Sequence, residues 1–517
     1  MKLRLVPTTL VAAASCLVLS APATPAAPRP AAHGTSASAA TGTSAATGID
    51  GADGAGGDRS GDWVAAWTTS PQGVYPYGYT VGQPGTPGEV LQGFEQPLLT
   101  QALPERQAQD QTLRMIVHPG IGGETWRVKL SNRFGTRPVT FARASAALQE
   151  SGARLVPGTS QPLTFAGQAS VTLQPGEEVR SDPLRAHLSD ADAQRSNVAI
   201  SLHVTGASGP MTWHAASFTT SYLTDPGAGD HTGAVGDDAF AHPTTSWFFV
   251  SGLEVQRRDA ATVVALGDSI TDGFFSTVNG DDRWPDLLQR RLLDTRAGSG
   301  GGGWGGGGWS RGGSGRDSGE EVISVVNQGI GGNMVTRVGR LPGGCQPCDG
   351  PSAADRLEQD VLSQPGVRAV IWLEGINDLG GGGAATAEQV IAGMREVAAR
   401  LDERGIALIG ATLTPSGGSA VGPDYGSART DAERREINDF IRSSDVFDAV
   451  ADFAAATEDP ADPSRLLPAY DTNTSVGGAG DGLHPNRAGF QAMAATIDLQ
   501  RLRDLVEDAA AAQREAA

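Results

Sequence analysis

The sequence has few cysteines and few cationic side chains for its length. Its 517 residues include 3 cysteines, and 39 Lys and Arg residues stand against 58 Asp and Glu residues, which gives a formal net charge of −19. A chain this acidic repels polyanions, so its composition argues against nucleic acid as a partner and against electrostatic binding to an anionic membrane. The length predicts about two to four domains.

Long hydrophobic runs are absent beyond the beginning of the chain, so no later segment is suited to cross a bilayer. The first residues combine a short basic start, an apolar stretch and an A-x-A motif that ends at Ala23. This order is typical of an export signal. We therefore predict a signal peptide at residues 1–23 and a secreted protein with no integral membrane segment after signal removal.

Removal of the signal leaves two cysteines, Cys345 and Cys348, in the stretch "GGCQPCDG". In a cytosolic protein a C-x-x-C pair suggests a redox or metal site. Export implies an oxidising compartment, and the sequence has no second pair to complete a zinc site. We therefore prefer a local Cys345–Cys348 disulfide and predict no metal.

Three changes in amino-acid composition and hydrophobic pattern divide the chain. Residues 24–61 are rich in Ala, Gly, Ser, Thr and Pro, which predicts a disordered leader. Residues 62–257 contain short β-branched and aromatic runs between turn residues, which predicts an all-β sandwich domain. In residues 258–510 strands alternate with helices, which predicts a parallel sheet covered on both faces. A Gly-rich stretch at 297–319 interrupts this region and is expected to be a surface loop.

The first strand of the α/β region, in "VVALGDSITDG", leads directly to Ser269. Parallel sheets carry their functional loops at the carboxyl ends of the strands, so Ser269 is expected at that edge. The nucleophile elbow G-x-S-x-G has a second glycine where this chain has Thr271. Ser269 is therefore either an ordinary turn residue or the nucleophile of a different hydrolase architecture.

A serine nucleophile needs a base, and histidine is the usual one near neutral pH. Of the 8 histidines, only His484 lies in the α/β region. It follows Asp481 by three residues, and a tight turn between them can bring the carboxylate to the imidazole. Pro485 suits the first turn of a helix and so places His484 at a helix entrance. We prefer a base at His484 over a surface histidine.

Two glycine-rich turns follow the second and third predicted strands. In "NQGIGGN" (327–333) the glycines let backbone N–H groups approach a substrate closely. In "EGINDLG" the side-chain amide of Asn377 can donate to a developing oxyanion. Each turn is a weak signal by itself, but together they follow Ser269 in chain order on successive strands.

These four blocks resemble those of the SGNH (GDSL) hydrolase superfamily, whose nucleophile block also lacks the second elbow glycine. The resemblance implies a flavodoxin-like three-layer α/β/α fold. It assigns Ser269 as nucleophile and as the first oxyanion donor, Gly332 as the second N–H donor and Asn377 as the side-chain donor. It assigns His484 as the base and Asp481 as its orienting acid, and it implies no cofactor.

The sequence leaves the role of one glycine open, and for four other polar residues we prefer a structural interpretation. Gly331, beside Gly332, leaves the register of the backbone donor open. We prefer a loop-stabilising role for Asp268 and Asp378, because polar side chains next to a turn commonly bind its backbone. His214 is expected to pack on a strand face, and Arg283 is expected to be solvated.

The blocks, together with "LSNRFGTRPV" in the β region, also resemble secreted bacterial GDSL esterases that have an N-terminal β-sandwich. The resemblance implies a serine esterase. As its substrate we prefer a small-molecule or polysaccharide ester with a short acyl group, such as acetylated plant polysaccharide. Two alternatives stay open: a lipase or phospholipase acting on lipid esters, and a glycan-binding protein with an incidental hydrolase scaffold. The sequence leaves the oligomeric state open.

Overall fold

The computed structural model describes residues 63–74, 102–298, 321–336, 349–380, 383–421, 424–472 and 478–516. The predicted signal peptide and leader lie outside the described residues. So do the predicted disulfide and nearly all of the Gly-rich insertion.

The α/β region is built on a five-stranded parallel sheet with the strand order β17-β16-β18-β19-β20. This is the flavodoxin-like order, with the first strand of the region between the second and the third. The strands are β16 (Ala260–Gly267), β17 (Val322–Gly329), β18 (Val367–Leu373), β19 (Ala407–Ala411) and β20 (Ala449–Ala451). Apart from Val450 on the edge strand β20, their β-branched and leucine side chains are buried on both faces, as expected for a covered parallel sheet.

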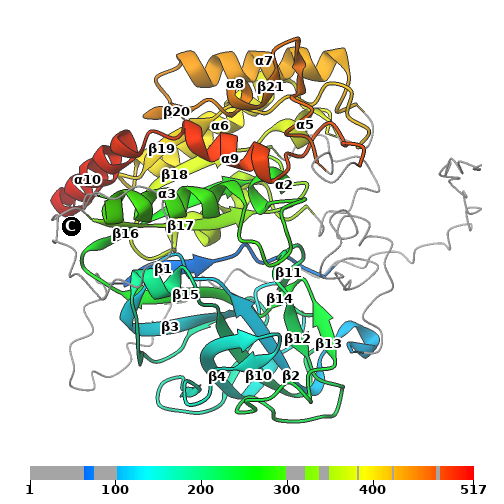
Figure 1. Cartoon of the computed structure of the whole chain (residues 1–517), viewed down its shortest axis with the longest axis vertical. Helices are drawn as coiled ribbons and strands as arrows, with labels where there is room; N and C mark the ends of the chain where they lie inside the picture. Colours follow the sequence, from blue (N-terminus) through cyan, green and yellow to red (C-terminus); the bar gives the residue numbers. More distant parts are fainter. Residues whose placement is uncertain are drawn as a thin grey trace, which may run out of the picture. The chain divides into compact units, whose positions relative to one another are not determined.

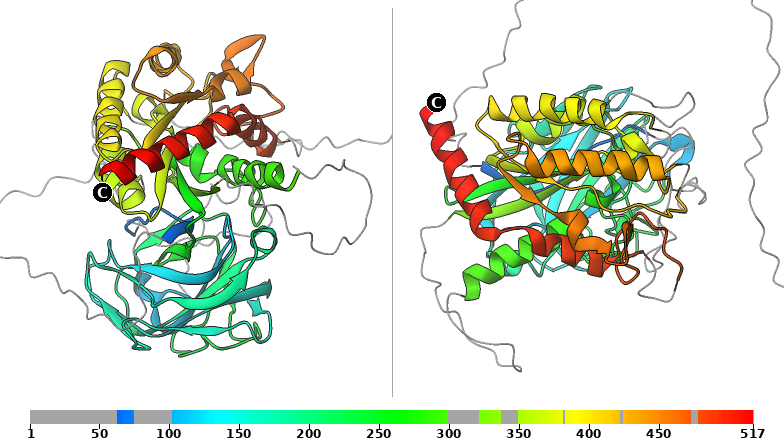
Figure 2. Two further views of the ribbon diagram at one scale, coloured as in Figure 1. Left: turned by 90° about the vertical axis from the view of Figure 1, so that its left-hand side faces the viewer. Right: turned by 90° about the horizontal axis from the view of Figure 1, so that it is seen from above.

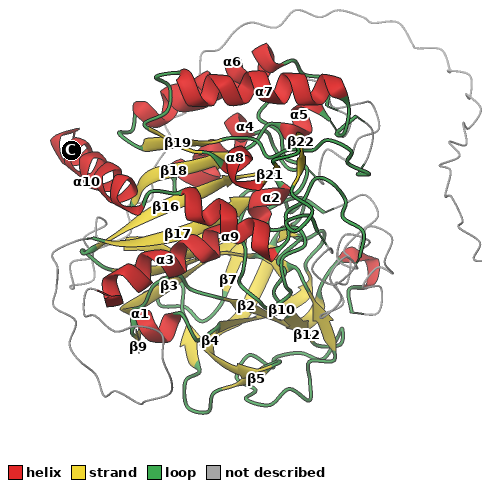
Figure 3. Cartoon of the chain, turned by 45° about the horizontal axis from the view of Figure 1, so that its top comes forward, coloured by secondary structure: helices red, strands yellow, loops and turns green. Residues whose placement is uncertain are grey.

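Helices cover both faces of this sheet (Figures 1 and 3). Along the chain they are α2 (Ser269–Asp272), α3 (Trp284–Gly298), α4 (Ala353–Leu357) with the π-turn η4 (Glu358–Leu362), α5 (Ile376–Leu379), α6 (Ala387–Asp402), α7 (Ala428–Ser443), α8 (Phe453–Thr457), α9 (Arg487–Thr496) and α10 (Leu499–Ala516). Contacts join α4 with α6 and α6 with α7 on one face, and α3 with α9 on the other. The hairpin β21 (Glu458–Asp459) and β22 (Asp462–Leu466) follows α8.

The preceding region is all-β, with two antiparallel sheets. One sheet has the order β1-β15-β3-β8, with β9 also paired to β3, and the other has the order β13-β12-β2-β10-β4-β5, with β6 and β7 also paired to β4. The first contains β1 (Trp63–Thr68), β3 (Gly123–Ser131), β8 (Glu178–Arg180), β9 (Leu184–Leu188) and β15 (Val250–Gln256). The second contains β2 (Gln109–Val117), β4 (Val139–Ser151), β5 (Arg154–Leu155), β6 (Gln161–Leu163), β7 (Val171–Leu173), β10 (Val198–Ala207), β12 (Ser221–Leu223) and β13 (His242–Thr244).

Three short elements complete the β region: the 3-10 turn η3 (Pro104–Arg106), the helix α1 (Asp190–Ala193) and a small two-stranded sheet of β11 (Trp213–His214) and β14 (Trp247–Phe248). The fold class predicted from the sequence, a three-layer α/β/α domain preceded by an all-β region, is therefore confirmed.

The two regions share buried contacts along β1. The backbone N–H of Ala65 donates to the Thr262 hydroxyl, and the side chain of Ala65 belongs to the apolar core of the α/β region. Conversely, Ala260 and Val322 belong to the core of the β region. Figure 2 shows β1, in blue, next to the parallel sheet. The first strand of the β region therefore packs against β16 and β17.

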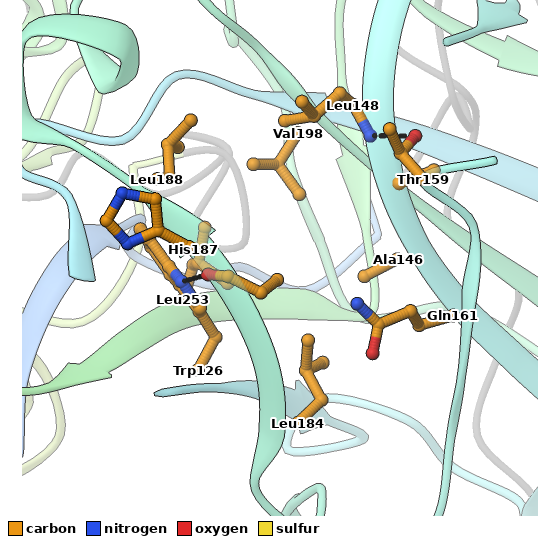
Figure 4. A pocket seen from close by; sticks show the side chains of 12 residues that line it. Trp126, Ala146, Leu148, Thr159, Gln161, Leu184, His187, Leu188, Val198 and Leu253 are labelled. Atoms are coloured by element: carbon orange, nitrogen blue, oxygen red, sulfur yellow. Dashed lines mark hydrogen bonds between the residues drawn. The ribbon is translucent and has the colours of Figure 1, made fainter. Parts of the chain in front are cut away.

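A cavity of about 230 Å³ opens within the β region (Figure 4). Its walls are mainly apolar and include Trp126, Leu148, Leu184, Val198 and Leu253. None of the site residues predicted from the sequence lines it.

Candidate active site

Ser269 lies at the carboxyl edge of the sheet, immediately after β16. Asp268 caps the short helix α2, because its carboxylate accepts the N–H of Ile270 at 3.0 Å. Ser269 is then the first helical residue, and its own N–H has no partner within the helix. A Cβ at Gly267 would lie 2.3 Å from the Leu373 carbonyl oxygen and from the Thr271 hydroxyl, so only glycine fits between strand and serine.

The structure brings Ser269, His484 and Asp481 into one hydrogen-bonded row. The Ser269 Oγ is 3.0 Å from His484 Nε2, and His484 Nδ1 is 2.7 Å from Asp481 Oδ2. Ser269 and His484 are separated by 215 residues in the chain. Because the carboxylate can only accept a hydrogen bond, Nδ1 carries the proton and Nε2 is free to accept from the serine.

Asp481 is held as a carboxylate by the turn that it occupies. Its Oδ1 accepts the backbone N–H groups of Leu483 and His484, both at 2.9 Å. Burial by itself would raise the pKa of Asp481, but the hydrogen bonds from His484 and from these amides outweigh it and lower the pKa below its ordinary value. The charge needed beside the imidazole is therefore present at neutral pH.

The segment after His484 differs in one detail from the sequence prediction. Helix α9 begins at Arg487 and is capped by Asn486, whose side chain accepts the N–H groups of Ala488 and Gly489. Pro485 therefore precedes the helix and does not occupy its first turn. His484 is still next to a helix entrance, but the capping residue is an asparagine.

The loop after β17 presents the predicted backbone donor. Gly332 has a φ of 78°, and a Cβ on it would lie 2.5 Å from Asp349 Oδ1. The N–H of the neighbouring Gly331 donates to Asp272 Oδ2 at 3.1 Å, so this group is occupied. The N–H of Gly332 has no acceptor among the described residues. This difference favours Gly332 over Gly331 as the oxyanion donor.

The amide of Asn377 is oriented by two partners. Its Oδ1 accepts the Tyr425 hydroxyl at 2.6 Å, and its Nδ2 donates one hydrogen to the Asn333 carbonyl at 2.9 Å. Burial raises the pKa of the Tyr425 phenol, which therefore remains a donor. An amide nitrogen has two hydrogens, so the second remains for an oxyanion.

Asp378, next to Asn377, fixes the loop that follows Gly332. Its carboxylate accepts the N–H groups of Val335 and Thr336, both at 2.9 Å, and the Thr336 hydroxyl at 2.6 Å. Burial raises the pKa of Asp378 to about 7, although these hydrogen bonds lower it in part. The loop-stabilising role expected from the sequence fits these contacts.

Beneath the site, buried Arg356 binds the carboxyl ends of β16 and β17 and the side chain of Asn333. Its guanidinium donates to the Gly267 carbonyl at 2.8 Å, to the Gln328 carbonyl at 2.6 Å and to Asn333 Oδ1 at 2.8 Å. It also pairs with Asp360 at 2.9 Å. Close by, burial raises the pKa of Asp268 well above its usual range, because the carboxyl lies in an almost water-free interior.

Aromatic rings surround His484. Phe274 stacks on the imidazole with a centroid separation of 5.7 Å, and Phe275 lies at 5.5 Å. Phe218, from the β region, packs edge-on against Phe274 at 5.7 Å. The three rings form an apolar wall on one side of the base, and one of them comes from outside the α/β region.

One expectation from the sequence is wrong and another is incomplete. Arg283 is not solvated: it is buried and donates to the Ser217 carbonyl. His214 does more than pack on a strand face, because its Nε2 is 3.0 Å from Asp272 Oδ1. Sequence reasoning also missed Tyr425 and Arg356, which lie in stretches without any motif and are recognisable only from the fold.

A parallel flavodoxin-like sheet whose loops carry a serine, glycines and an asparagine at one edge, with a histidine closing the site, is the arrangement that the resemblance to SGNH hydrolases implies. Residues 265–492 match the model of the GDSL-like Lipase/Acylhydrolase family. This part of the chain is therefore a GDSL-like domain, and the protein is a carboxylic ester hydrolase.

Several solved structures are similar to this half of the chain. A carbohydrate acetylesterase family member from Sinorhizobium meliloti is 15% identical, with a TM-score of 0.32, and the match covers 48% of this chain and 99% of that one. A GDSL-like lipase from Bacteroides thetaiotaomicron is 15% identical, with a TM-score of 0.30 and coverage of 47% and 88%.

An acetyl xylan esterase is 18% identical, with a TM-score of 0.28 and coverage of 46% and 96%. No curated protein matches the sequence.

Two further findings concern the described residues as a whole. None of their helices has the length and apolar character needed to cross a membrane. No group of three or more His, Cys, Asp or Glu side chains in this part of the chain is placed to hold a metal ion.

Proposed function

We propose that the protein is a secreted serine esterase in which Ser269 is the nucleophile, His484 the general base and Asp481 the acid that orients it. The observation that carries this proposal is the continuous row from Ser269 Oγ to His484 Nε2 at 3.0 Å and from His484 Nδ1 to Asp481 Oδ2 at 2.7 Å. Hydrogen-bonded contact of a nucleophile with an oriented base is the arrangement that acyl transfer requires.

In the first half-reaction the Ser269 oxygen forms a bond to the ester carbonyl carbon while its proton passes to His484 Nε2. The carbonyl electrons move to the oxygen, which accepts hydrogen bonds from the N–H groups of Ser269 and Gly332 and from the Asn377 amide. The intermediate collapses, the bond to the alkoxy oxygen breaks, and the alcohol leaves with the proton from His484. Water then attacks the acyl-enzyme by the same route and releases the carboxylic acid.

The preferred substrates are esters of short acyl groups, such as acetyl groups on polysaccharide. Two features support a small acyl group. The first is the burial of the site, since Ser269 is only 6% exposed and His484 only 4%. The aromatic wall of Phe218, Phe274 and Phe275 stands beside the base. We expect these rings to limit the room for a long acyl chain beside the base.

The first test is hydrolysis of p-nitrophenyl esters from acetate to palmitate by the wild type and by Ser269→Ala. We expect the highest kcat/KM on acetate and loss of activity on every ester in the variant. A maximum at long acyl chains would replace the short-acyl assignment with a lipase. Equal inactivity of both proteins would favour the glycan-binding alternative.

Secretion is the second part of the proposal and rests on the N-terminal signal pattern. Expression of the full-length chain in a secreting bacterial host should release a protein that begins near residue 24 into the medium. N-terminal sequencing of that protein is the measurement, and a chain that stays in the cell with its first residues intact would contradict the proposal.

A further inference from the structure

His214, a histidine of the β region, contacts Asp272 in the short helix that begins with Ser269. His214 is at the end of β11 and is only 3% exposed, and its Nε2 lies 3.0 Å from Asp272 Oδ1. Asp272 ends α2, three residues after the nucleophile, and its other oxygen accepts the N–H of Gly331 at 3.1 Å. A continuous path of hydrogen bonds therefore leads from the β region to the residue that precedes the oxyanion donor Gly332.

The position of His214 is fixed on its other sides as well. Its Nδ1 lies 2.9 Å from the carbonyl oxygen of Ser70, and its ring packs at 5.6 Å against Trp247. Because a carbonyl oxygen can only accept, Nδ1 carries a hydrogen. The Nε2 then shares one proton with the Asp272 carboxylate, so this contact is a charge-assisted or proton-sharing hydrogen bond in an almost dry interior.

The segment that anchors His214 is itself bound to the loop that holds Gly331. The Ser70 hydroxyl donates to Gln328 Oε1 at 2.6 Å, and Gln328 Nε2 donates to the Thr68 hydroxyl at 2.7 Å. Gln328 lies on β17 directly before the loop of Gly331 and Gly332. The β region therefore binds this loop at its start through Gln328 and in its middle through Asp272.

We propose that His214 is a positioning residue for ester hydrolysis: through Asp272 it fixes the Gly331 peptide, so that the next N–H, that of Gly332, is aimed at the oxyanion. Gly331 and Gly332 have no side chains to define their conformation, so an external acceptor has to do so. The β region is then part of the catalytic apparatus, because the α/β region alone lacks the group that holds Asp272. This inference rests on the proposed function.

The kinetic test compares the full-length wild type with His214→Ala, Asp272→Asn and the double variant on p-nitrophenyl acetate. Misplacing an oxyanion donor affects the transition state more than substrate binding, so we expect kcat to fall about 10- to 100-fold in each single variant, with KM changing less than about threefold. If both residues act through one path, the double variant loses little more than the worse single variant. Additive losses, or wild-type kcat in both single variants, would overturn the proposal.

Two further variants separate positioning from folding. His214→Gln keeps one N–H donor for Asp272 and should recover part of the lost kcat, which a general loss of packing would not allow. His203→Ala is the matched control, because His203 also pairs with an aspartate, Asp110 at 3.1 Å, and both of these residues lie on strands of the β region. We expect this control to keep wild-type kcat.

A measurement that does not depend on catalysis can test the His214–Asp272 contact independently of the proposed function. Amide hydrogen exchange, followed by mass spectrometry of peptides that cover 327–336, should be faster in His214→Ala and in Asp272→Asn than in the wild type. If the wild type hydrolyses no ester but exchange responds in this way, the esterase proposal fails and the positioning contact stands. Unchanged exchange in both variants would overturn the contact even in an active enzyme.

Discussion

At the scale of single residues, Asp481 determines which ring nitrogen of His484 carries the hydrogen. The carboxylate fixes the imidazole in the tautomer that leaves Nε2 free for Ser269, and two backbone amides hold the carboxylate in turn. The pKa of Asp481 lies below its ordinary value, so its charge persists into acidic solution. A fall of activity in mildly acidic solution would then not report protonation of Asp481.

We predict that Asp481→Asn lowers kcat on p-nitrophenyl acetate by roughly 10²- to 10⁴-fold, because an amide in this place can donate to the ring and favour the wrong tautomer. Asp462→Asn is a suitable control, since Asp462 is exposed on β22 and its carboxylate accepts hydrogen bonds from Ser464 and pairs with Arg465. Steady-state kinetics of both variants check the prediction. A variant at position 481 with wild-type kcat would remove Asp481 from the mechanism.

Asp481 also stabilises the folded state, and this contribution depends on pH. Because its pKa is lowered by folding, the stabilisation is present above the ordinary value of 3.8 and is lost as the pH falls through the lower pKa of the folded state. The stability difference between the wild type and Asp481→Asn should therefore be constant near neutral pH and shrink below about pH 4.

At the scale of secondary-structure elements, the site depends on strand ends that lie level with one another. Gly267 of β16 pairs with Gly329 of β17 on one side and with Leu373 of β18 on the other. The loops that follow these three strands therefore begin at the same edge, which brings the serine, the glycines and the asparagine together. The order of motifs on successive strands predicted this arrangement because parallel sheets align their carboxyl ends.

Gly332→Ala tests the loop after β17. A side chain at this position has an unfavourable φ of 78° and would lie 2.5 Å from Asp349, so the loop must shift and its N–H with it. We expect kcat to fall by about 10²-fold or more. The matched control is Gly167→Ala in the β region, where φ is 75° and nothing lies within 4 Å of the new methyl group. Equal activity of both variants would contradict an oxyanion role for Gly332.

The raised pKa of Asp378, which lies on α5, predicts that the free energy of unfolding depends on pH. Its pKa rises from 3.8 to about 7 on folding, so the folded state binds the proton more tightly than the unfolded state. Stability from this group is fully present below the ordinary value and is lost as the pH rises towards 7, with a slope of at most about 1.4 kcal/mol per pH unit.

Urea unfolding of the wild type and of Asp378→Asn between pH 5 and 8 measures this effect. The stability of the wild type relative to the variant should decline as the pH rises. A difference that is independent of pH would show that Asp378 is already ionised at pH 5 in the folded protein.

At the scale of the whole molecule, the all-β and α/β regions are joined by buried polar and apolar contacts. Arg356 donates to the Ser70 hydroxyl at 3.2 Å, Ala65 packs into the core of the α/β region, and His214 pairs with Asp272. These contacts predict that the regions lose their structure together. Scanning calorimetry should record one transition with equal calorimetric and van't Hoff enthalpies. Two resolved transitions would contradict this coupling.

The sequence predicted the fold class because helix and strand periodicities are local, and it singled out the site residues because they lie in short motifs at strand ends. Contacts between distant segments were not predictable in this way. His214 and Tyr425 approach the motifs only after the chain has folded, and no spacing relates them to Ser269. Arg283 was misjudged because its position at a helix start gave no sign of the Ser217 carbonyl that binds it.

The proposed mechanism requires that His484 activates Ser269 as a nucleophile. The measurement that tests this requirement is reaction with an alkyl fluorophosphonate, followed by mass spectrometry of the peptide that contains residue 269. We predict one adduct on Ser269 in the wild type, no adduct on this peptide in Ser269→Ala and a rate at least about 10²-fold lower in His484→Ala. An adduct on another residue, or a rate that does not depend on His484, would contradict it.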